Sequence, residues 1–259
     1  MILEAKDISC GYGSKTIIEN ISLSIKSSEI LCLLGPNGVG KTTFFKTMLG
    51  FLKLQRGEIT IDGENIGNWN RKKIAMAIAY VPQVHNPPFP FTVMDVVLMG
   101  RTAHFSTISS PSKTDIKIAE ETMSALKISY LKDKIYTEIS GGERQMILIA
   151  RALTQKPKIL VMDEPTSNLD FGNQIRVLSQ INKLSKDGLG IIMTSHFPDH
   201  AFLCSSKVAL MQKNKPFQSG TADEIVTEEN LKSAYGINVK ITSLDYNGEK
   251  IKSCVPLLD

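Results

Sequence analysis

The sequence predicts an α/β fold with a central, mostly parallel sheet, an N-terminal antiparallel β-subdomain and an inserted α-helical subdomain. Alternation of apolar and polar residues in the first third predicts strands with one buried face. Short apolar runs elsewhere predict strands that are covered on both faces, as in a parallel sheet. A middle segment with apolar residues at helical spacing predicts the insertion.

The antiparallel subdomain is expected from residues 2–8, 21–25 and 58–61, where apolar and polar side chains alternate. Successive side chains of a strand point to opposite faces, so each segment buries one face and exposes the other. Strands of this half-buried kind are typical of antiparallel sheets.

The central sheet is expected from residues 30–34, 158–162 and 190–193. Each is a short, mainly apolar run that ends in polar residues. A strand of a parallel sheet is covered on both faces and therefore lacks the alternation of a half-buried strand.

The helical insertion is expected around residues 111–130, between the proline-rich stretch 82–90 and the pair Lys156-Pro157. Helical spacing predicts one inward-facing set, namely Ile116, Ala119, Met123, Leu126 and Ile128. The set expected to face solvent is Lys113, Asp115, Lys117, Glu120 and Glu121.

Composition indicates one globular unit, because 42% of the 259 residues are hydrophobic and 22% are charged. The net charge of +4 is spread along the chain, and its one basic cluster, residues 71–73, is interpreted as a solvated helix face. We therefore expect no nucleic-acid partner. Four cysteines form no C-x-x-C pair and are expected to be free thiols: Cys10, Cys32, Cys204 and Cys254.

No stretch of the sequence predicts a membrane span. The longest candidate, residues 89–100, is interrupted by Pro90, Thr92 and Asp95 and is shorter than the roughly 20 apolar residues that a span needs. The N-terminus has no basic region followed by an apolar stretch. We expect a soluble chain that stays in the cytosol.

A glycine-rich loop lies between the first apolar run and a helical stretch at residues 43–49. It matches G-x-x-x-x-G-K-[ST], which in this context is typical of a phosphate-binding loop. Its glycines let backbone N–H groups surround an anion, and the helix N-terminus adds its dipole. The residues expected to bind ATP here are Gly35, Pro36, Asn37, Gly38, Val39, Gly40, Lys41, Thr42 and Thr43.

Two acids follow the second apolar run. Asp163 is expected to hold Mg²⁺ through water, together with the hydroxyl of Thr42. Glu164 is expected to orient and deprotonate the attacking water, while Lys41 supplies positive charge to the β- and γ-phosphates. Two acids after a strand are often only a helix cap, but their pairing with the phosphate loop favours catalysis.

Residues 140–145, Ser-Gly-Gly-Glu-Arg-Gln, precede a helical stretch at residues 146–153. Ser140 and the amides of Gly141 and Gly142 would form a second anion site at a helix N-terminus, and a capped helix start is the alternative. The run resembles the signature sequence of ABC ATPases. It differs in having Ile139 where leucine is usual and Glu143 where glutamine is commoner.

The resemblance implies a homodimer that holds two ATP molecules between its copies. In that family the phosphate loop of one copy is closed by the signature of the other, so Ser140, Gly141, Gly142 and Glu143 are expected to face the partner's nucleotide. Asp170, at the end of Ser-Asn-Leu-Asp, matches the loop that reaches the partner's site.

Three more residues match family elements. Tyr12 matches the aromatic residue that stacks on adenine, although a tyrosine in an ordinary turn is the alternative. Gln83 matches the glutamine that touches Mg²⁺ and the attacking water, and His196 matches the histidine that contacts the γ-phosphate. His196 and His200 also have the spacing of a helical metal pair, but the proline between them argues against it. The catalytic set is therefore Lys41, Gln83, Glu164 and His196.

The chain resembles most the ATP-binding subunits that import iron-siderophore, haem or cobalamin. Residues 91–101, 169–174 and 227–236 carry this resemblance. It implies a transmembrane permease that docks on residues 91–101, an extracytoplasmic binding protein that acts indirectly, and a location on the cytoplasmic face of the membrane. Core packing of the apolar run at residues 89–99 is the alternative to docking. Molybdate or tungstate import, an exporter subunit and a soluble remodelling ATPase remain alternatives for the function.

The domain organisation follows from these motifs. Asn247-Gly248, the preferred pair of a two-residue turn, lies between alternating segments 239–241 and 251–253 and predicts a hairpin. We expect a single domain over residues 1–259. Its parts are a nucleotide-binding core (1–83 and 157–235), a helical subdomain with the signature (84–156) and a C-terminal hairpin (236–259).

Overall fold

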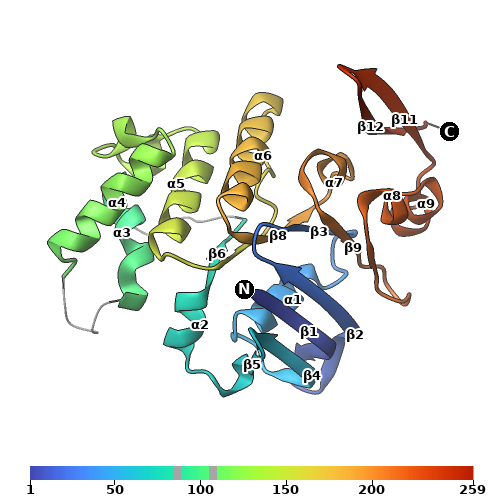
Figure 1. Cartoon of the computed structure of the whole chain (residues 1–259), viewed down its shortest axis with the longest axis horizontal. Coiled ribbons are helices and arrows are strands. Elements are labelled where there is room, and N and C mark those ends of the chain that lie inside the picture. Colours follow the sequence, from blue (N-terminus) through green and yellow to red (C-terminus); the bar gives the residue numbers. More distant parts are fainter. Residues whose placement is uncertain (84–88, 105–109, 259) are drawn as a thin grey trace.

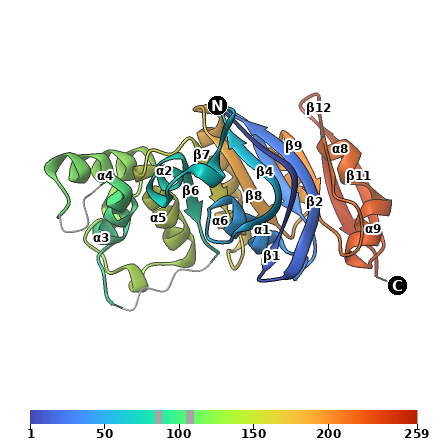
Figure 2. The same ribbon diagram turned by 90° about the horizontal axis from the view of Figure 1, so that it is seen from below.

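The computed structural model describes residues 1–83, 89–104 and 110–258. Two sheets adjoin in the middle of the molecule, with helices to one side and the C-terminal elements at the opposite end (Figures 1 and 2). Residues 84–88 of the proline-rich stretch lie outside the described part. The predicted α/β class is confirmed.

The antiparallel sheet contains all three strands expected in the first third of the chain. Its order is β2-β1-β4-β5, and every pairing is antiparallel. The strands are β1 (Ile2–Tyr12), β2 (Lys15–Lys26), β4 (Leu54–Ile61) and the short β5 (Glu64–Asn65). The two-residue periodicity therefore predicted this sheet correctly.

The central sheet has the order β10-β9-β3-β8-β7-β6, with parallel pairing from β9 to β6. The three apolar runs form β3 (Ile30–Leu34), β7 (Ile159–Met162) and β8 (Gly190–Ser195). The remaining strands are β6 (Ile78–Val81), β9 (Lys207–Leu210) and the antiparallel edge strand β10 (Gln218–Gly220).

Both faces of the central sheet are buried, as its apolar runs predict. On β3, Leu31 and Leu33 pack with Phe44 and Phe45 of α1 (Lys41–Met48) in the core shared with the antiparallel sheet. The alternate residues, Cys32 among them, enter a second core formed with the helices on the other face. This double cover fixes the position of β3 and hence of the loop that follows it.

The helical side of the molecule comprises α3 (Val93–Leu98), α4 (Lys113–Ala125) and α5 (Gly141–Thr154) (Figure 1). Helix α6 (Phe171–Lys186) lies between these helices and the C-terminal elements (Figure 1). Short 3-10 turns connect the group, at Met99–His104, Ser129–Leu131 and Tyr136–Glu138. Of the apolar run at residues 89–99, Val93, Val96 and Val97 lie in the core while Phe89 is 64% exposed.

Two positions on α4 are opposite to the prediction. Ile116 is exposed, whereas Asp115 is only 7% exposed. Asp115 closes a capping box with Ser112 and accepts a hydrogen bond from Nε of Arg101 at 2.9 Å. These partners hold the pKa of Asp115 below its usual value, chiefly through the Ser112 hydrogen bond. Asp115 is therefore buried because Arg101 and Ser112 satisfy its carboxylate, although the helical periodicity predicts that it faces solvent.

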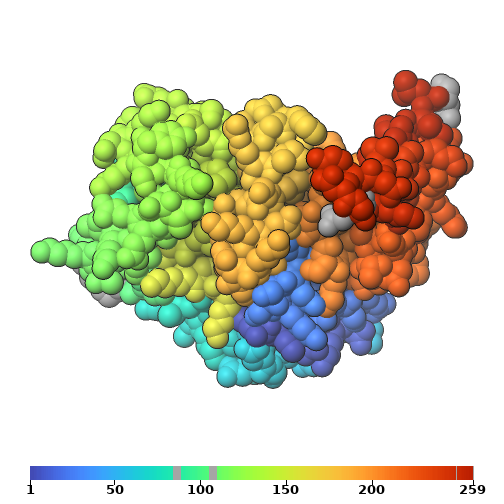
Figure 3. Space-filling view, turned by 45° about the horizontal axis from the view of Figure 1, so that its top comes forward, coloured from blue at the N-terminus to red at the C-terminus, as the bar shows by residue number. Residues whose placement is uncertain are grey.

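The C-terminal elements lie at the end of the molecule opposite the α3–α5 helices (Figure 2). They are α7 (Asp199–Cys204), α8 (Ala222–Ile225), α9 (Glu228–Tyr235) and the hairpin β11 (Val239–Tyr246) and β12 (Glu249–Pro256). Asn247 and Gly248 both have positive φ at the turn, as a two-residue hairpin turn of type I′ requires. The predicted hairpin is confirmed, and it projects from the body of the molecule (Figure 3).

Smaller expectations also hold. Residues 71–73 lie exposed on α2 (Arg71–Ala77), after the 3-10 turn Ile66–Asn68, and all four cysteines are free thiols. Among the described residues, we find no helix whose length and apolar character would let it cross a bilayer.

Candidate functional site

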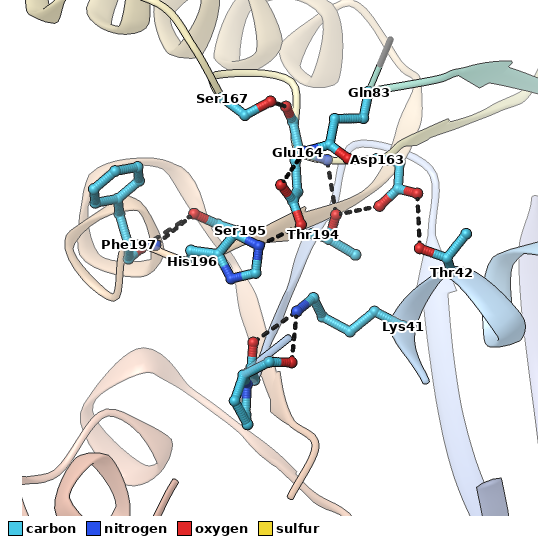
Figure 4. Close-up of polar contacts among 12 residues, drawn as sticks. Lys41, Thr42, Gln83, Asp163, Glu164, Ser167, Thr194, Ser195, His196 and Phe197 are labelled. Carbon is cyan, nitrogen blue, oxygen red and sulfur yellow. Dashed lines mark hydrogen bonds and ion pairs between the residues drawn. The ribbon is translucent and has the colours of Figure 1, made fainter. Parts of the chain in front are cut away.

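The four predicted catalytic residues meet at one edge of the central sheet. Strands β3, β8, β7 and β6 are neighbours and run parallel, so their carboxyl ends lie side by side. The segments that leave these ends carry Lys41, His196, Glu164 and Gln83 respectively (Figure 4). Ligands of open α/β sheets bind in the crevice outside such an edge.

The glycine-rich loop leaves β3 in a conformation that only glycine accommodates easily. Gly35 has φ 148°, and a Cβ there would lie 2.5 Å from the carbonyl oxygen of Met211. Gly40 has φ 111° at the N-cap of α1, where a Cβ would lie 2.8 Å from Ile18. Helix α1 then begins at Lys41, so free N–H groups and the positive end of the helix dipole face the loop.

Lys41 lies inside this loop. Its side chain is buried, and Nζ donates to the carbonyl oxygens of Gly35 at 2.7 Å and Pro36 at 3.1 Å (Figure 4). Burial lowers the pKa of Lys41, and the neighbouring carboxylates of Glu164 and Asp163 oppose that shift. The loop thus holds the ammonium group of Lys41 on two of its own carbonyl oxygens. Thr43, by contrast, is buried within α1.

Asp163 follows β7 and has hydrogen-bond donors on both carboxylate oxygens. Thr194 Oγ1 donates to Oδ1 at 2.8 Å and Thr42 Oγ1 donates to Oδ2 at 3.1 Å (Figure 4). The Tyr80 hydroxyl lies 3.4 Å from Oδ2, and burial raises the pKa of Tyr80. Asp163 is itself only 5% exposed, so these groups rather than bulk water surround its carboxylate.

The oxygens around Asp163 fit Mg²⁺. One carboxylate beside the hydroxyl of Thr42 offers hard oxygen ligands, and Mg²⁺ typically takes one or two carboxylates, waters and substrate phosphates. In the described ranges, no group of three or more His, Cys, Asp or Glu side chains could hold a metal by itself. A metal at this edge would therefore need phosphate oxygens as further ligands. The alternative pair of His196 and His200 forms no such group.

Glu164 has an unusual backbone for its residue type, with φ 48°. Its N–H donates to Thr194 Oγ1 at 2.8 Å, which supports this conformation. Its carboxylate accepts a hydrogen bond from Gln83 Nε2 at 2.6 Å and contacts His196 Nε2 (Figure 4). Strained backbone is concentrated at functional sites. Glu164 is thus held between Gln83 and His196, two other members of the predicted catalytic set.

Thr194 is the functional residue that sequence reasoning missed. Its hydroxyl links the backbone of Glu164 to the carboxylate of Asp163, so one side chain aligns both acids. The sequence feature that could have indicated Thr194 is its position as a hydroxyl residue within the mainly apolar, fully buried strand β8. A hydroxyl there needs hydrogen-bond partners.

The start of α5 is separate from this network in the described residues. Ser140 is the N-cap, and its Oγ and N–H both donate to Oε2 of Glu143, at 2.8 and 2.9 Å. Gly142 has no room for a side chain, because a Cβ would lie 2.6 Å from Asn173. The side-chain hydrogen bonds of Ser140 therefore stay within its own capping box, and Gly141 and Gly142 begin the helix beside α6.

Two other predicted residues lie outside the network. Tyr12 is at the end of β1 and is 47% exposed. Asp170 is the N-cap of α6, where it accepts from the N–H of Asn173 at 2.9 Å. The structure thus brings together Lys41, Thr42, Gln83, Asp163, Glu164 and His196 but not Tyr12, Ser140, Gly141, Gly142, Glu143 and Asp170.

Chemically, the sheet edge combines an anion-binding loop, a pair of oxygens suited to Mg²⁺ and a carboxylate held by an amide and an imidazole. This combination matches what phosphoryl transfer to water requires, because positioning and electrostatic stabilisation carry most of that reaction.

Comparisons with known proteins agree with this chemistry. A family model described as ABC transporter matches residues 18–167. An ABC transporter ATP-binding protein of Haemophilus influenzae is 40% identical over 98% of this chain and 96% of its own length. A Helicobacter pylori protein that carries the name of an iron chelatin transport ATP-binding protein is 36% identical, over 91% of this chain and 93% of its own.

A solved structure has the same architecture. It is described as a metal-chelate type ABC transporter in an inward-facing conformation. The TM-score is 0.88 at 30% identity, and the match covers 99% of this chain and 97% of that one.

Proposed function

This chain belongs to the ABC transporter family and hydrolyses ATP, and we propose that it powers import of a metal chelate through a separate membrane permease. The observation that supports the substrate class is the end-to-end likeness to the structure described as a metal-chelate type transporter. The name of the H. pylori relative points to the same class.

In the proposed mechanism, the phosphate loop binds the triphosphate of ATP. Free amides at the start of α1 surround the phosphates. Lys41 leaves the carbonyl oxygens of Gly35 and Pro36 and donates instead to the β- and γ-phosphates, which are stronger acceptors because they are charged. Tyr12, exposed at the end of β1, stacks on adenine.

Thr42, Gln83 and, through water, Asp163 would hold Mg²⁺, and the bound ion would neutralise charge that develops on the phosphates. The chain's own contribution is positioning. Thr194 keeps Asp163 fixed, and Thr42 already lies 3.1 Å from the Asp163 carboxylate.

Glu164 orients and deprotonates the attacking water. A general base must lie within hydrogen-bond reach of the water, and the carboxylate of Glu164 faces the same edge as the phosphate loop (Figure 4). Gln83 orients the same water, and His196 contacts the γ-phosphate. Both already contact Glu164, so the three groups act on neighbouring positions around the reacting phosphorus.

The working unit in this proposal is a homodimer with two composite sites. Ser140, Gly141, Gly142, Glu143 and Asp170 of one copy face the nucleotide held by Lys41 of the other. Each copy then supplies one binding surface of each kind, as a closed twofold assembly requires. The separation of α5 from the sheet-edge network within one chain supports this arrangement.

The permease is proposed to dock on the segment around α3, with the exposed Phe89 at its border. The chain then works on the cytoplasmic face of the membrane, and an extracytoplasmic binding protein delivers the chelate to the permease. The domain division proposed above assigns this docking segment and the signature to the same subdomain, residues 84–156.

Affinity purification of the tagged chain from gently solubilised native membranes tests the proposal. We expect a polytopic membrane protein at comparable abundance, and uptake of a ferric siderophore, haem or cobalamin by the reconstituted complex. Uptake of molybdate instead would change the substrate class. Only soluble partners, with no chain in the membrane pellet, would replace the transporter by a remodelling ATPase.

A further inference from the structure

The turn that carries His196 is closed by the side chain before it. Ser195 ends β8, and its Oγ accepts a hydrogen bond from the N–H of Phe197 at 3.0 Å (Figure 4). The same Oγ lies 2.8 Å from Nδ1 of His200, which is on the next helix, α7. The hydrogen bonds of Ser195 therefore span both sides of His196.

The direction of the second hydrogen bond follows from burial. His200 is only 5% exposed, and this burial lowers its pKa, against a smaller opposing effect of the Asp199 carboxylate. A neutral imidazole has one acceptor nitrogen. The single hydrogen of Ser195 Oγ has two acceptors in reach, Nδ1 of His200 at 2.8 Å and the carbonyl oxygen of Phe197 at 3.3 Å, and the shorter distance favours donation to Nδ1.

The turn is also fixed by a hydrogen bond from the His200 N–H to the Phe197 carbonyl at 3.1 Å and by packing of the Phe197 and His200 rings, whose centroids lie 5.2 Å apart. Phe197 is 48% exposed, and the side chain of His196 is 28% exposed. Helix α7 has only six residues, and Pro198 at its N-cap makes no side-chain hydrogen bond. The position of His196 relative to Glu164 thus depends on the hydrogen bonds that its neighbours make.

Asp199 connects the same helix to the C-terminal hairpin. Its Oδ1 accepts from Oγ of Ser253 at 2.8 Å and from the N–H of Cys254 at 2.9 Å. Both donors belong to β12, more than fifty residues further along the chain. The first two residues of α7 therefore hold the hairpin on one side and the His196 turn on the other.

We propose that Asp199 and His200 are positioning residues for ATP hydrolysis, which hold His196 in place and tie its turn to the C-terminal hairpin. The inference rests on the proposed contact of His196 with the γ-phosphate. It adds a role for His200 and for the hairpin, neither of which touches the reacting atoms.

The first test compares His200→Leu with His200→Asn. Leucine removes the acceptor, whereas asparagine places an amide oxygen near the position of Nδ1. For His200→Leu we expect kcat to fall about tenfold with KM for ATP within about twofold, because a small displacement of a group at the reaction centre lowers kcat. His200→Asn is expected to recover most of that loss. Ser195→Ala removes the same contact with a smaller change in volume, so the test does not depend on the leucine variant folding.

The link between α7 and the C-terminal hairpin is tested by Asp199→Ala. We expect kcat to fall about threefold, because two hydrogen bonds to β12 are lost. Lys252→Ala is the matched control. It removes an ion pair of the same strand, with Asp223 at 2.7 Å, but does not touch Asp199. This control is expected to keep the wild-type kcat.

Testing His200→Leu in a protein that already lacks His196 separates a positioning role from a general structural effect. If His200 acts through His196, then adding His200→Leu to His196→Ala lowers kcat no further, since coupled residues are not additive. If the double variant instead loses kcat by the product of the two single losses, the inference is overturned. A wild-type kcat in both His200→Leu and Ser195→Ala would also overturn it, and either result leaves the proposed function intact. A wild-type kcat in His196→Ala would instead remove the proposed role of His196 itself.

Discussion

The sheet edge and the start of α5 are both proposed to bind phosphate, yet they are organised in opposite ways. At the edge, side chains from four strand ends hydrogen-bond to one another, as Thr194 does with Asp163 and Glu164. At the start of α5, the side chains of Ser140 and Glu143 hydrogen-bond to each other, and Glu143 also accepts from the Tyr130 hydroxyl at 3.1 Å, so neither contacts the sheet edge in the described structure. The first region can prepare a reaction inside one chain, whereas the second lacks a reacting group of its own and has to meet one elsewhere.

The largest effect is expected at the sheet edge, from Glu164→Gln. We expect ATP turnover to fall about 1000-fold, because a general base is lost while the amide keeps the size of the side chain. Mg-ATP affinity, measured by isothermal titration, stays near the wild-type value. Turnover near the wild-type rate would remove Glu164 from the role of base.

Ser140→Asp tests the other region. Aspartate caps a helix as well as serine does, so α5 still begins at the same residue, but the added charge repels a phosphate brought by a second copy. We expect steady-state turnover to fall about 100-fold, as for loss of one stabilising donor at a reaction centre. Ser140→Asn, a neutral cap, is the control and retains most turnover. Equal turnover of the two variants would contradict a phosphate contact at Ser140.

Thr194→Val tests whether the hydrogen bonds of Thr194 to the two acids are needed for ATP turnover. Valine keeps the shape of threonine but removes the hydroxyl that joins Asp163 to the N–H of Glu164. Two buried groups then lose a partner, and we expect turnover to fall about tenfold or more. Thr194→Ser restores the hydroxyl and is expected to restore turnover. A Thr194→Val enzyme as fast as the wild type would show that the acids align without this residue.

The smallest effect is expected from Tyr235→Phe. The Gly35 N–H donates to the Tyr235 hydroxyl at 3.2 Å, and the carbonyl of the same glycine accepts from Lys41. Losing one neutral hydrogen bond costs about 1 kcal/mol, so we expect ATP affinity to weaken about fivefold. Tyr246→Phe, at an exposed tyrosine of the hairpin, is the control. Unchanged affinity in Tyr235→Phe would show that α9 does not support the loop.

Local sequence signals predicted much of the fold and part of the site. The loop around Lys41 and the strand before Asp163 could be predicted, because each is formed by contiguous residues with a recognisable pattern. Contacts between segments that are distant in the sequence could not be predicted. Asp115 is buried because Arg101 and Ser112 satisfy it, and no periodicity shows that partnership. Likewise, nothing near Asp199 in the sequence indicates that Ser253 lies beside it.

The central claim is that the start of α5 of one copy binds the nucleotide held at the sheet edge of another. The most direct test measures molecular mass by light scattering in the presence of Mg-ATP, for the Glu164→Gln variant and for the double variant Glu164→Gln with Ser140→Asp. We expect a dimer for Glu164→Gln and a monomer for the double variant, although both bind Mg-ATP equally well as single chains. A Glu164→Gln protein that stays monomeric with Mg-ATP bound would contradict the account. So would a double variant whose single chains no longer bind nucleotide, because Ser140 would then serve the site of its own copy.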